Sequence, residues 1–397
     1  MTARLSFVCA CLLGGACESG SAGDGTWSAE RTRRGDTTIV RTVEGSVWGP
    51  DVRLVEELRV GVLDGDENYI FGRILNVTPD RSGNVYVLER SPALLRMYDA
   101  QGRFVRTIAR EGQGPGELFE AVRVETLADG RIVVWNRGNQ RVSAYFAADG
   151  ALLDEWPVRS NFFSAQPLSV DSADNLYIQI LTGEPVDGKP WPLGQLVVSS
   201  SGEVLDTLVE PQWDPDGGLL APTGHVAVHP GGYFVAGWAG QYSFDVLRDP
   251  PLRVEKDWTP VALTGAEREE WDALIRRRRE QGLVLLSRAG PVDMTIPDTK
   301  PAYRGLYVGR DGRIWVHLYV DVEEQEVDPG SNERRWQEPI VFDVFEDDGR
   351  YLGRIRMPNG ASAHAWDGDY VWGVQRGESD EPYIVRWRIE RSPLEGS

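Results

Sequence analysis

The amino-acid sequence predicts an all-β fold, a six-bladed β-propeller, from three observations. A short phrase in which a turn residue precedes a β-forming apolar run occurs six times along the chain. The first copies of this phrase are followed by the same order of strand, turn and strand. The last copy lacks a final strand, and a spare strand precedes the first copy. A repeat of roughly 40–50 residues built from short strands is typical of propeller blades, because one small sheet buries both faces only against neighbouring sheets.

The repeated phrase starts with glycine, or with a residue that replaces glycine in a turn, and continues with residues such as valine, isoleucine and tyrosine. These side chains favour strands, and glycine favours the turn that leads into them. We therefore expect one strand of each blade to begin at each copy. The six copies span residues 83–87, 130–134, 174–178, 231–235, 312–316 and 368–372.

The first two copies each continue into a strand, a turn and a further strand. Alternation of polar and apolar residues predicts the strands, and Asp and Gly predict the turns. The strand, the turn and the further strand are expected at 94–98, 99–102 and 104–108 after the first copy, and at 141–146, 149–150 and 152–156 after the second.

The sixth copy leaves its blade one strand short. After this copy the sequence has room for strands at 370–374 and 383–389 before a polar tail at 393–397. A spare strand is predicted at 53–60, ahead of the first copy. Pairing this strand with the last blade would close the ring and remove sheet edges that otherwise invite aggregation. The sequence therefore predicts a six-bladed propeller over 51–392, closed by an N-terminal strand.

One helical insertion is expected near 264–281. Thr264 and Glu267 match a capping box, acidic residues follow in the early turns, and Gly282 comes after the last turn. The basic run 276–279 would then lie at the helix C-terminus, where positive charge complements the helix dipole. This interpretation makes the arginine run a solvated helix end.

Length, composition and charge limit the classes of function. The chain has 397 residues, which would ordinarily suggest two or three domains, but a closed propeller forms one unit. Hydrophobic residues make up 41% of the chain, enough for a sizeable core. The formal net charge of -19 argues against a nucleic-acid partner, because phosphate binding needs a concentrated basic face.

The first residues are typical of an export signal. Arg4 precedes an uncharged stretch at 5–13, and small residues lead up to Cys17. This apolar stretch is too short to span a bilayer. It resembles a bacterial lipoprotein signal, which implies cleavage in front of Cys17 and lipidation of this cysteine. On this interpretation 1–17 is the signal segment and 18–50 a flexible tether and lead-in, of which the residues up to about 36 are rich in Ser, Gly, Thr and Arg.

An ordinary secretory signal with Cys17 near its cleavage site is the alternative. Both alternatives predict export, with the lipoprotein signal adding a membrane anchor in the periplasm or at the cell surface. All three cysteines lie in the first seventeen residues. The folded part therefore has no thiol for a disulfide, a nucleophile or a cysteine-ligated zinc.

Three of the four histidines are distributed one to a blade in the second half of the chain: His225, His317 and His364. If these imidazoles met on the axis, they would hold zinc with an open position for water. Isolated histidines are more often hydrogen-bonded structural groups, and no local ligand spacing supports a metal site. Calcium ligands gathered from separate loops leave no clear sequence pattern. We therefore predict no cofactor, with zinc or calcium as the alternative.

Polar residues follow the repeated strand at corresponding places in three copies. Loops from several blades converge on one face of a propeller, and a rigid scaffold often carries binding residues on such loops. Turn chemistry explains the same residues without a ligand. The candidate ligand-binding residues are Glu89, Arg90, Asn136, Arg137, Asn139, Gln375 and Arg376.

The order of the copies resembles NHL-repeat and related six-bladed propellers. The segments 54–61, 108–117 and 311–316 are more closely similar to a family of bacterial six-bladed propeller lipoproteins. That family has no established reaction, so the resemblance implies an exported scaffold that binds a ligand or a protein. It brings no catalytic residues to this chain. The alternative is a metal-dependent lyase or hydrolase with its site on the central axis, because propellers host both kinds of function.

Overall fold

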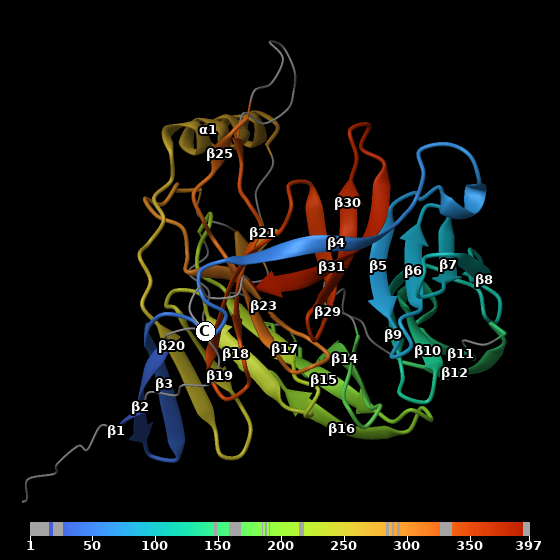
Figure 1. Ribbon diagram of the computed structural model, residues 1–397, viewed down its shortest axis with the longest axis horizontal. Coiled ribbons are helices and arrows are strands. Elements are labelled where there is room, and N and C mark those ends of the chain that lie inside the picture. Colours follow the sequence, from blue (N-terminus) through green and yellow to red (C-terminus); the bar gives the residue numbers. More distant parts are fainter. Residues whose placement is uncertain are drawn as a thin grey trace, which may run out of the picture.

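The computed structural model describes residues 16–18, 27–146, 149–158, 168–184, 186, 189, 191–213, 218–282, 286–287, 290–291, 294–325 and 336–391. Within these ranges the chain forms six blades around a common axis (Figure 1). Five blades are four-stranded sheets, and the fourth blade is extended to seven strands by the N-terminal residues. The predicted all-β, six-bladed fold is therefore confirmed.

The strands of each blade follow one another from the axis outwards. Blade 1 consists of β5 (Ile74–Pro79), β6 (Val85–Arg90), β7 (Ala93–Tyr98) and β8 (Phe104–Arg110). Blade 2 consists of β9 (Ala121–Thr126), β10 (Arg131–Asn136), β11 (Arg141–Phe146) and β12 (Leu152–Pro157). Blade 3 consists of β13 (Ser169–Val170), β14 (Leu176–Leu181), β15 (Leu193–Val198) and β16 (Val204–Val209).

The other three blades have the same order. Blade 4 contains β17 (Gly224–Val228), β18 (Phe234–Trp238), β19 (Ser243–Val246) and β20 (Leu252–Lys256). Blade 5 contains β23 (Tyr303–Val308), β24 (Ile314–Leu318), β27 (Val341–Phe345) and β28 (Tyr351–Arg356). Blade 6 contains β29 (Ala361–Asp367), β30 (Tyr370–Arg376), β31 (Pro382–Arg391) and β4 (Val52–Val60).

The repeated phrase forms the turn into the second strand of every blade. In blade 1, Asp80 Oδ1 accepts the backbone N–H groups of Ser82 at 2.8 Å and Asn84 at 2.9 Å. Gly83 in the same turn has a φ of +84°, a conformation that glycine adopts without strain. Asp171 accepts two backbone N–H groups in the same manner in blade 3. The phrase is therefore explained by turn geometry followed by burial of the apolar strand.

Strand β4 closes the ring, as the sequence predicts. It pairs antiparallel with β31, from Val60 opposite Ile384 to Val52 opposite Arg391. Strand β4 is thus the outermost strand of blade 6, and the chain passes directly from it into blade 1. One blade contains strands from both ends of the chain, so neither end can detach without opening the ring.

An N-terminal hairpin lies within residues 18–50, the segment that the sequence predicts to be a flexible tether and lead-in. Strands β2 (Ser28–Arg34) and β3 (Thr37–Glu44) pair antiparallel, and β3 runs parallel to β20 at the edge of blade 4 (Figure 1). Val40 is fully buried there. Strand β2 thus lies in the part that composition predicts to be a flexible tether, and β3 lies in the lead-in. A few buried apolar side chains anchor this hairpin although its average composition is polar.

Strand β1 (Ala16–Glu18) adds to the edge of this hairpin, with Cys17 opposite Glu30 of β2. The rest of the predicted signal segment, residues 1–15, lies outside the described residues, as does the predicted tail at 393–397.

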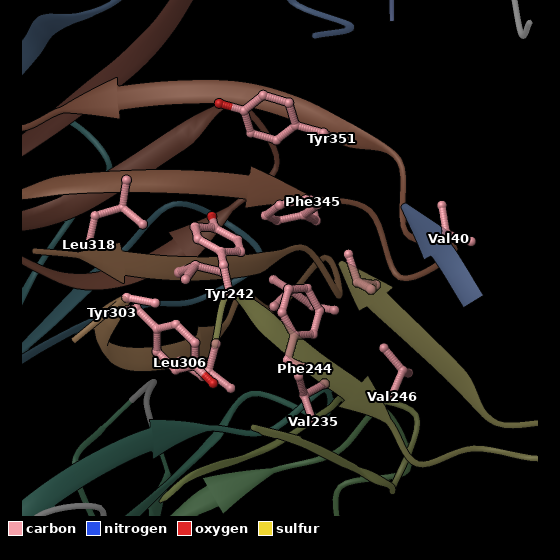
Figure 2. Close-up of a cluster of buried hydrophobic side chains, with 14 of the residues drawn as sticks. Val40, Val235, Tyr242, Phe244, Val246, Tyr303, Leu306, Leu318, Phe345 and Tyr351 are labelled. Atoms are coloured by element: carbon pink, nitrogen blue, oxygen red, sulfur yellow. The ribbon is translucent and has the colours of Figure 1, made fainter. Parts of the chain in front are cut away.

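Aromatic side chains fill the interface between blades 4 and 5. Figure 2 shows Tyr242 and Phe244 of blade 4 facing Phe345 of blade 5. The ring centroids of Phe244 and Phe345 lie 5.4 Å apart in an edge-to-face arrangement, which is favourable for aromatic pairs. The propeller core is therefore a set of such layers between neighbouring sheets.

A buried charge cluster lies beside these rings. Asp343 is fully buried and accepts hydrogen bonds from Tyr242 Oη at 2.6 Å and Tyr351 Oη at 2.9 Å. Lys256 Nζ and Arg354 Nε each lie 2.8 Å from its oxygens. Burial alone would raise the pKa of Asp343, but the two cations lower this pKa to about 2. The carboxylate is thus charged and fully partnered, as a buried charge must be.

The predicted helical insertion is confirmed as α1 (Gly265–Glu280). Thr264 and Glu267 form the predicted capping box. Buried Lys300 lies 2.7 Å from Glu267, so an ion pair fastens the start of the helix to the chain that enters blade 5. Among the residues that the structure describes, no helix has the length and apolar character needed to cross a membrane.

Four short strands and two 3₁₀ turns complete the described secondary structure. They are β21 (Leu286–Ser287) paired with β22 (Gly290–Pro291), β25 (Glu323–Glu324) paired with β26 (Trp336–Gln337), and the turns at Glu67–Tyr69 and Arg137–Asn139. Both α1 and β25 lie at the top of the view in Figure 1, on the side where the second strands of the blades end.

Ring closure can be tested by shortening the chain. A chain that begins at residue 61 lacks β4, and we expect it to aggregate or to melt roughly 10 °C or more below a chain that begins at residue 27, because the edge of blade 6 is then unpaired. A chain that begins at residue 45 loses the hairpin but keeps β4, and it should melt between the two. Thermal unfolding and size-exclusion chromatography measure both effects. Equal melting of the chains that begin at 45 and 61 would contradict closure by β4.

Candidate functional site

A cavity of about 360 Å³ lies on the propeller axis, at the end of the central channel where the innermost strands finish. We call it the axial pocket. All six blades contribute to its wall, through β9, β13, β29, the ends of β17 and β23, and the turn after β5. Its polar side chains include Arg81, Arg123, Glu125, Arg310, His364 and Asp367.

Hydrogen bonds between neighbouring blades hold this end of the ring together. They link blades 1 to 6 in succession, and in each bond at least one partner is a backbone group. The bonds are Val124 N to Asn76 Oδ1 (2.9 Å), Ala128 N to Asp174 Oδ1 (2.8 Å), Ser172 N to Pro230 O (2.8 Å), His229 Nε2 to Gly312 O (3.2 Å) and Arg310 N to Trp366 O (2.9 Å).

Arg310 spans the axis at the pocket. Its backbone belongs to the turn after β23 of blade 5, but its Nη1 donates to Pro79 O of blade 1 and to Thr126 Oγ1 of blade 2, both at 2.7 Å. Its Nη2 lies 3.1 Å from Glu125 Oε2, also in blade 2. One side chain thus ties three blades together across the channel and forms part of the pocket wall.

Glu125 is shared between two arginines. Its Oε2 accepts from Arg310, and its Oε1 accepts from Nε and Nη2 of Arg123, both at 2.8 Å. Glu125 is buried, whereas Arg123 is about one-third exposed. The carboxylate therefore fixes the orientation of both guanidinium groups, and each keeps N–H donors that are not used in these bonds.

The other acidic side chains of the pocket differ in how fully they are bonded. Asp171 accepts three hydrogen bonds within its own turn and a fourth from Tyr177 Oη of β14, and Asp174 Oδ1 accepts the N–H of Ala128. Asp367 has no side-chain hydrogen bond or ion pair to any described residue, and the same is true of Arg81. The pocket thus contains two charged side chains that remain available to a ligand.

His364 lies in the wall of the pocket on β29. Its Nε2 is 3.2 Å from Ser362 Oγ. Burial, with a smaller contribution from the nearby Arg123 charge, lowers the pKa of His364 to about 4. The imidazole is therefore neutral at physiological pH, and a neutral imidazole offers one hydrogen-bond donor and one acceptor.

The other two predicted histidines lie elsewhere. His225 is near the start of β17, whereas the pocket forms where that strand ends, and its ring centroid is 5.6 Å from that of Tyr303. His317 contacts Phe342 in blade 5, with ring centroids 4.9 Å apart and the rings tilted by 36°. Burial lowers the pKa of His225 to about 4 and that of His317 to about 3. Across the described ranges, no group of three His, Cys, Asp or Glu side chains is placed to hold a metal ion.

Two of the predicted loop residues are buried parts of the scaffold. Glu89 accepts from Arg96 Nε at 2.8 Å, and both side chains are buried. Asn136 is also fully buried, where its Oδ1 accepts the N–H of Phe119 at 2.7 Å and its Nδ2 donates to Glu117 O at 2.6 Å. These side chains form hydrogen bonds with neighbouring groups of the scaffold and have little exposed surface for a ligand.

Three more loop residues have partners close in sequence or across a turn. Arg137 pairs with Glu120 at 3.0 Å, and Arg376 pairs with Asp380 at 2.9 Å. Gln375 Nε2 donates to backbone carbonyls, one of them that of Arg376. The partially exposed ion pairs contribute little to stability and can open for a partner.

Arg90 and Asn139 complete the predicted loop set. Arg90 is exposed, and Asn139 Nδ2 is buried without a hydrogen-bond partner in the described part of the chain. The structure places five of the seven residues at the ends of the second strands of blades 1, 2 and 6 and not in the loops: Glu89, Arg90, Asn136, Gln375 and Arg376. Arg137 and Asn139 follow β10 in a 3₁₀ turn. Second strands all end on the face opposite the axial pocket. The predicted loop set and the pocket are therefore separate sites.

Sequence reasoning missed the residues of the axial pocket. Arg123 and Glu125 alternate with apolar residues along β9, and this pattern is an ordinary sign of a strand with one polar face. It becomes a sign of a pocket only once β9 is known to be the innermost strand. Arg310 stands one residue before Asp311 in the turn of blade 5, where the sequence indicates only a turn.

No family model and no curated protein matches this sequence. Among solved structures, the chain is similar to a candidate exported protein from Bacteroides fragilis, with 11% identity, a TM-score of 0.50, and coverage of 85% of this chain and 95% of that one. It is also similar to a member of the DUF4221 family from Bacteroides vulgatus, with 12% identity, a TM-score of 0.52, and coverage of 86% and 99%. Virginiamycin B lyase from Staphylococcus aureus has 10% identity and a TM-score of 0.39, with coverage of 84% and 99%. The first two likenesses support the six-bladed propeller fold.

The lowered histidine pKa values predict acid sensitivity. Between pH 6.5 and about 4 the unfolded chain binds protons that folded His225, His317 and His364 do not, so the free energy of unfolding should fall as pH falls. We expect a loss of about 1–2 kcal/mol per histidine between pH 7.5 and 5, measured by urea unfolding. Replacing His317 with Asn should make this loss smaller. Equal stability at the two pH values would contradict the prediction.

Proposed function

We propose that this protein is an exported propeller that binds a small polar ligand in the axial pocket. The observation that carries the proposal is a cavity in which Arg81 and Asp367 are charged but have no partner among the described residues. Concave sites with a few convergent polar groups are the usual place for small ligands. The links between blades make this site rigid, which lowers the entropy cost of binding.

We favour the pocket over the loops that the sequence singles out. Glu89 and Asn136 are buried, and their side chains accept hydrogen bonds from backbone N–H groups of the scaffold. Arg137 and Arg376 have acidic partners. A protein partner on that opposite face is compatible with a ligand in the pocket, because the two sites do not overlap.

Export and anchoring are part of the same proposal. Export is supported by the charged start, the apolar stretch and the small residues before Cys17. The similar Bacteroides fragilis protein, itself a candidate exported protein, agrees with this. We propose that lipid on Cys17 holds the propeller to a membrane of the cell envelope, since a lipid chain adds a large apolar area that the bilayer can bury.

A pocket that binds small molecules can be tested by filling it. Purified protein is incubated with a metabolite extract, with and without a chelator, washed and denatured, and the released compounds are measured by mass spectrometry. Ser169 lines the pocket, so Ser169→Trp should abolish enrichment of any compound that the unchanged protein retains. Ser201→Trp, in an exposed turn of blade 3, is the matched control and should retain it. If the unchanged protein enriches no compound relative to Ser169→Trp, the proposed function is wrong.

The anchor has its own test. Cell fractionation should place the unchanged protein with membranes and the Cys17→Ser variant in the soluble envelope fraction, because the variant has no thiol to lipidate. Mass spectrometry of the N-terminal peptide checks the modification directly. Recovery of the unchanged protein in the soluble fraction with an unmodified N-terminus would rule out the lipid anchor.

A further inference from the structure

We propose that the ligand of the axial pocket is a sugar acid, a small molecule that carries one carboxylate beside several hydroxyl groups, and that Arg123 binds the carboxylate. This inference rests on the proposed function, because it specifies the chemistry of a ligand in that pocket. It follows from the donors, the acceptors, the total charge and the size of the site.

The arginines supply the carboxylate site. Arg123 uses Nε and Nη2 to bind Glu125. The other N–H groups of its guanidinium have no hydrogen-bond partner in the described part of the chain. The planar guanidinium fork matches a carboxylate and forms charge-assisted bonds that are stronger than neutral ones. Glu125 and its second partner, Arg310, hold this fork in place before any ligand arrives.

Acceptors and neutral groups in the same wall suit hydroxyl groups. Asp367 is an unpartnered carboxylate that can accept from hydroxyl donors. His364 is neutral, and because its Nε2 lies 3.2 Å from Ser362 Oγ, its Nδ1 is left for one hydrogen bond with a hydroxyl group. The hydroxyl of Ser169 can both donate and accept. A simple carboxylic acid would leave these groups unused, whereas a polyhydroxylated acid engages both kinds of partner.

The charge balance of the pocket opposes negative charge on a ligand, and it opposes two charges more strongly than one. The three arginines Arg81, Arg123 and Arg310 face four carboxylates, those of Glu125, Asp171, Asp174 and Asp367. A phosphate with nearly two charges would meet four carboxylates with too few cations to offset them. A single carboxylate needs only the local fork of Arg123.

The volume of the pocket limits the ligand to a small molecule. At about 360 Å³ it lies near the lower end of the ~300–1,000 Å³ that small-molecule sites span. Such a cavity suits one sugar ring with its carboxylate. We therefore infer recognition of a single acidic sugar and not of a long chain of them.

The test is isothermal titration calorimetry with matched acidic and neutral sugars. The probes are D-glucuronate and D-galacturonate, their neutral counterparts D-glucose and D-galactose, and acetate and inorganic phosphate. At least one sugar acid should bind roughly tenfold or more tightly than its neutral counterpart, than acetate and than phosphate, because each of these lacks one part of the matched set.

Arg123→Gln should weaken binding of the sugar acid about tenfold or more and bring its affinity close to that of the neutral sugar. Arg123→Lys keeps the charge without the fork and should have an intermediate effect. Arg103→Gln is the control, because Arg103 pairs with Asp99 on an exposed turn of blade 1. Melting temperatures check that every variant is folded. If Arg123→Gln does not fold, the comparison rests on the lysine variant.

Three outcomes would overturn the sugar-acid inference: no binding of either sugar acid, equal affinity for an acid and its neutral counterpart, or binding that Arg123 variants leave unchanged. Each of these leaves the proposed function standing if the metabolite experiment still finds a compound that Ser169→Trp abolishes. Failure of that metabolite experiment, in contrast, removes the pocket itself.

Discussion

The pairing of β4 with β31 is the constraint on which the rest of the structure depends. A blade lies in a fixed position only when both neighbours press on it, and the first and last blades become neighbours only when β4 completes blade 6. The inner strands then have a fixed spacing around the axis. Arg310 can reach from blade 5 to Pro79 and Thr126 because this spacing is held by the closed ring. The pocket on the axis therefore depends on the pairing of β4 with β31 at the outer edge of blade 6.

The architecture can be predicted from the sequence because every blade repeats the same turn followed by the same kind of apolar strand. The turn at Asp80 and Gly83 combines a side-chain acceptor with a residue of positive φ, and a residue of positive φ, usually glycine, returns in this turn of every blade. The closing strand can be predicted for a related reason. The sixth copy lacks the outer strand that the repeat requires, and a strand with no blade of its own precedes the first copy. The capping box of α1 depends on two residues three apart, and it too is a local signal.

The site could not be predicted from the sequence because its parts meet only in the closed ring. Arg123 and Glu125 stand two residues apart on β9 of blade 2, but Arg310 comes from the turn after β23 of blade 5. Residues that the sequence does single out, such as Glu89 and Asn136, are polar at the end of a strand because they form hydrogen bonds with backbone and charged groups of the scaffold. The hairpin β2–β3 was missed in the same way, because its anchoring residue Val40 is buried by blade 4 and not by its own sequence neighbours.

The N-terminal hairpin determines where on the propeller the N-terminal end of the chain is attached. Strands β1 and β2 are the last strands of the seven-stranded sheet, at the outer rim of blade 4. If Cys17 carries the proposed lipid, the point of attachment lies in β1 at this rim and on neither face of the propeller. The face with the axial pocket and the opposite face, where the second strands end, would then both be accessible to binding partners independently of each other.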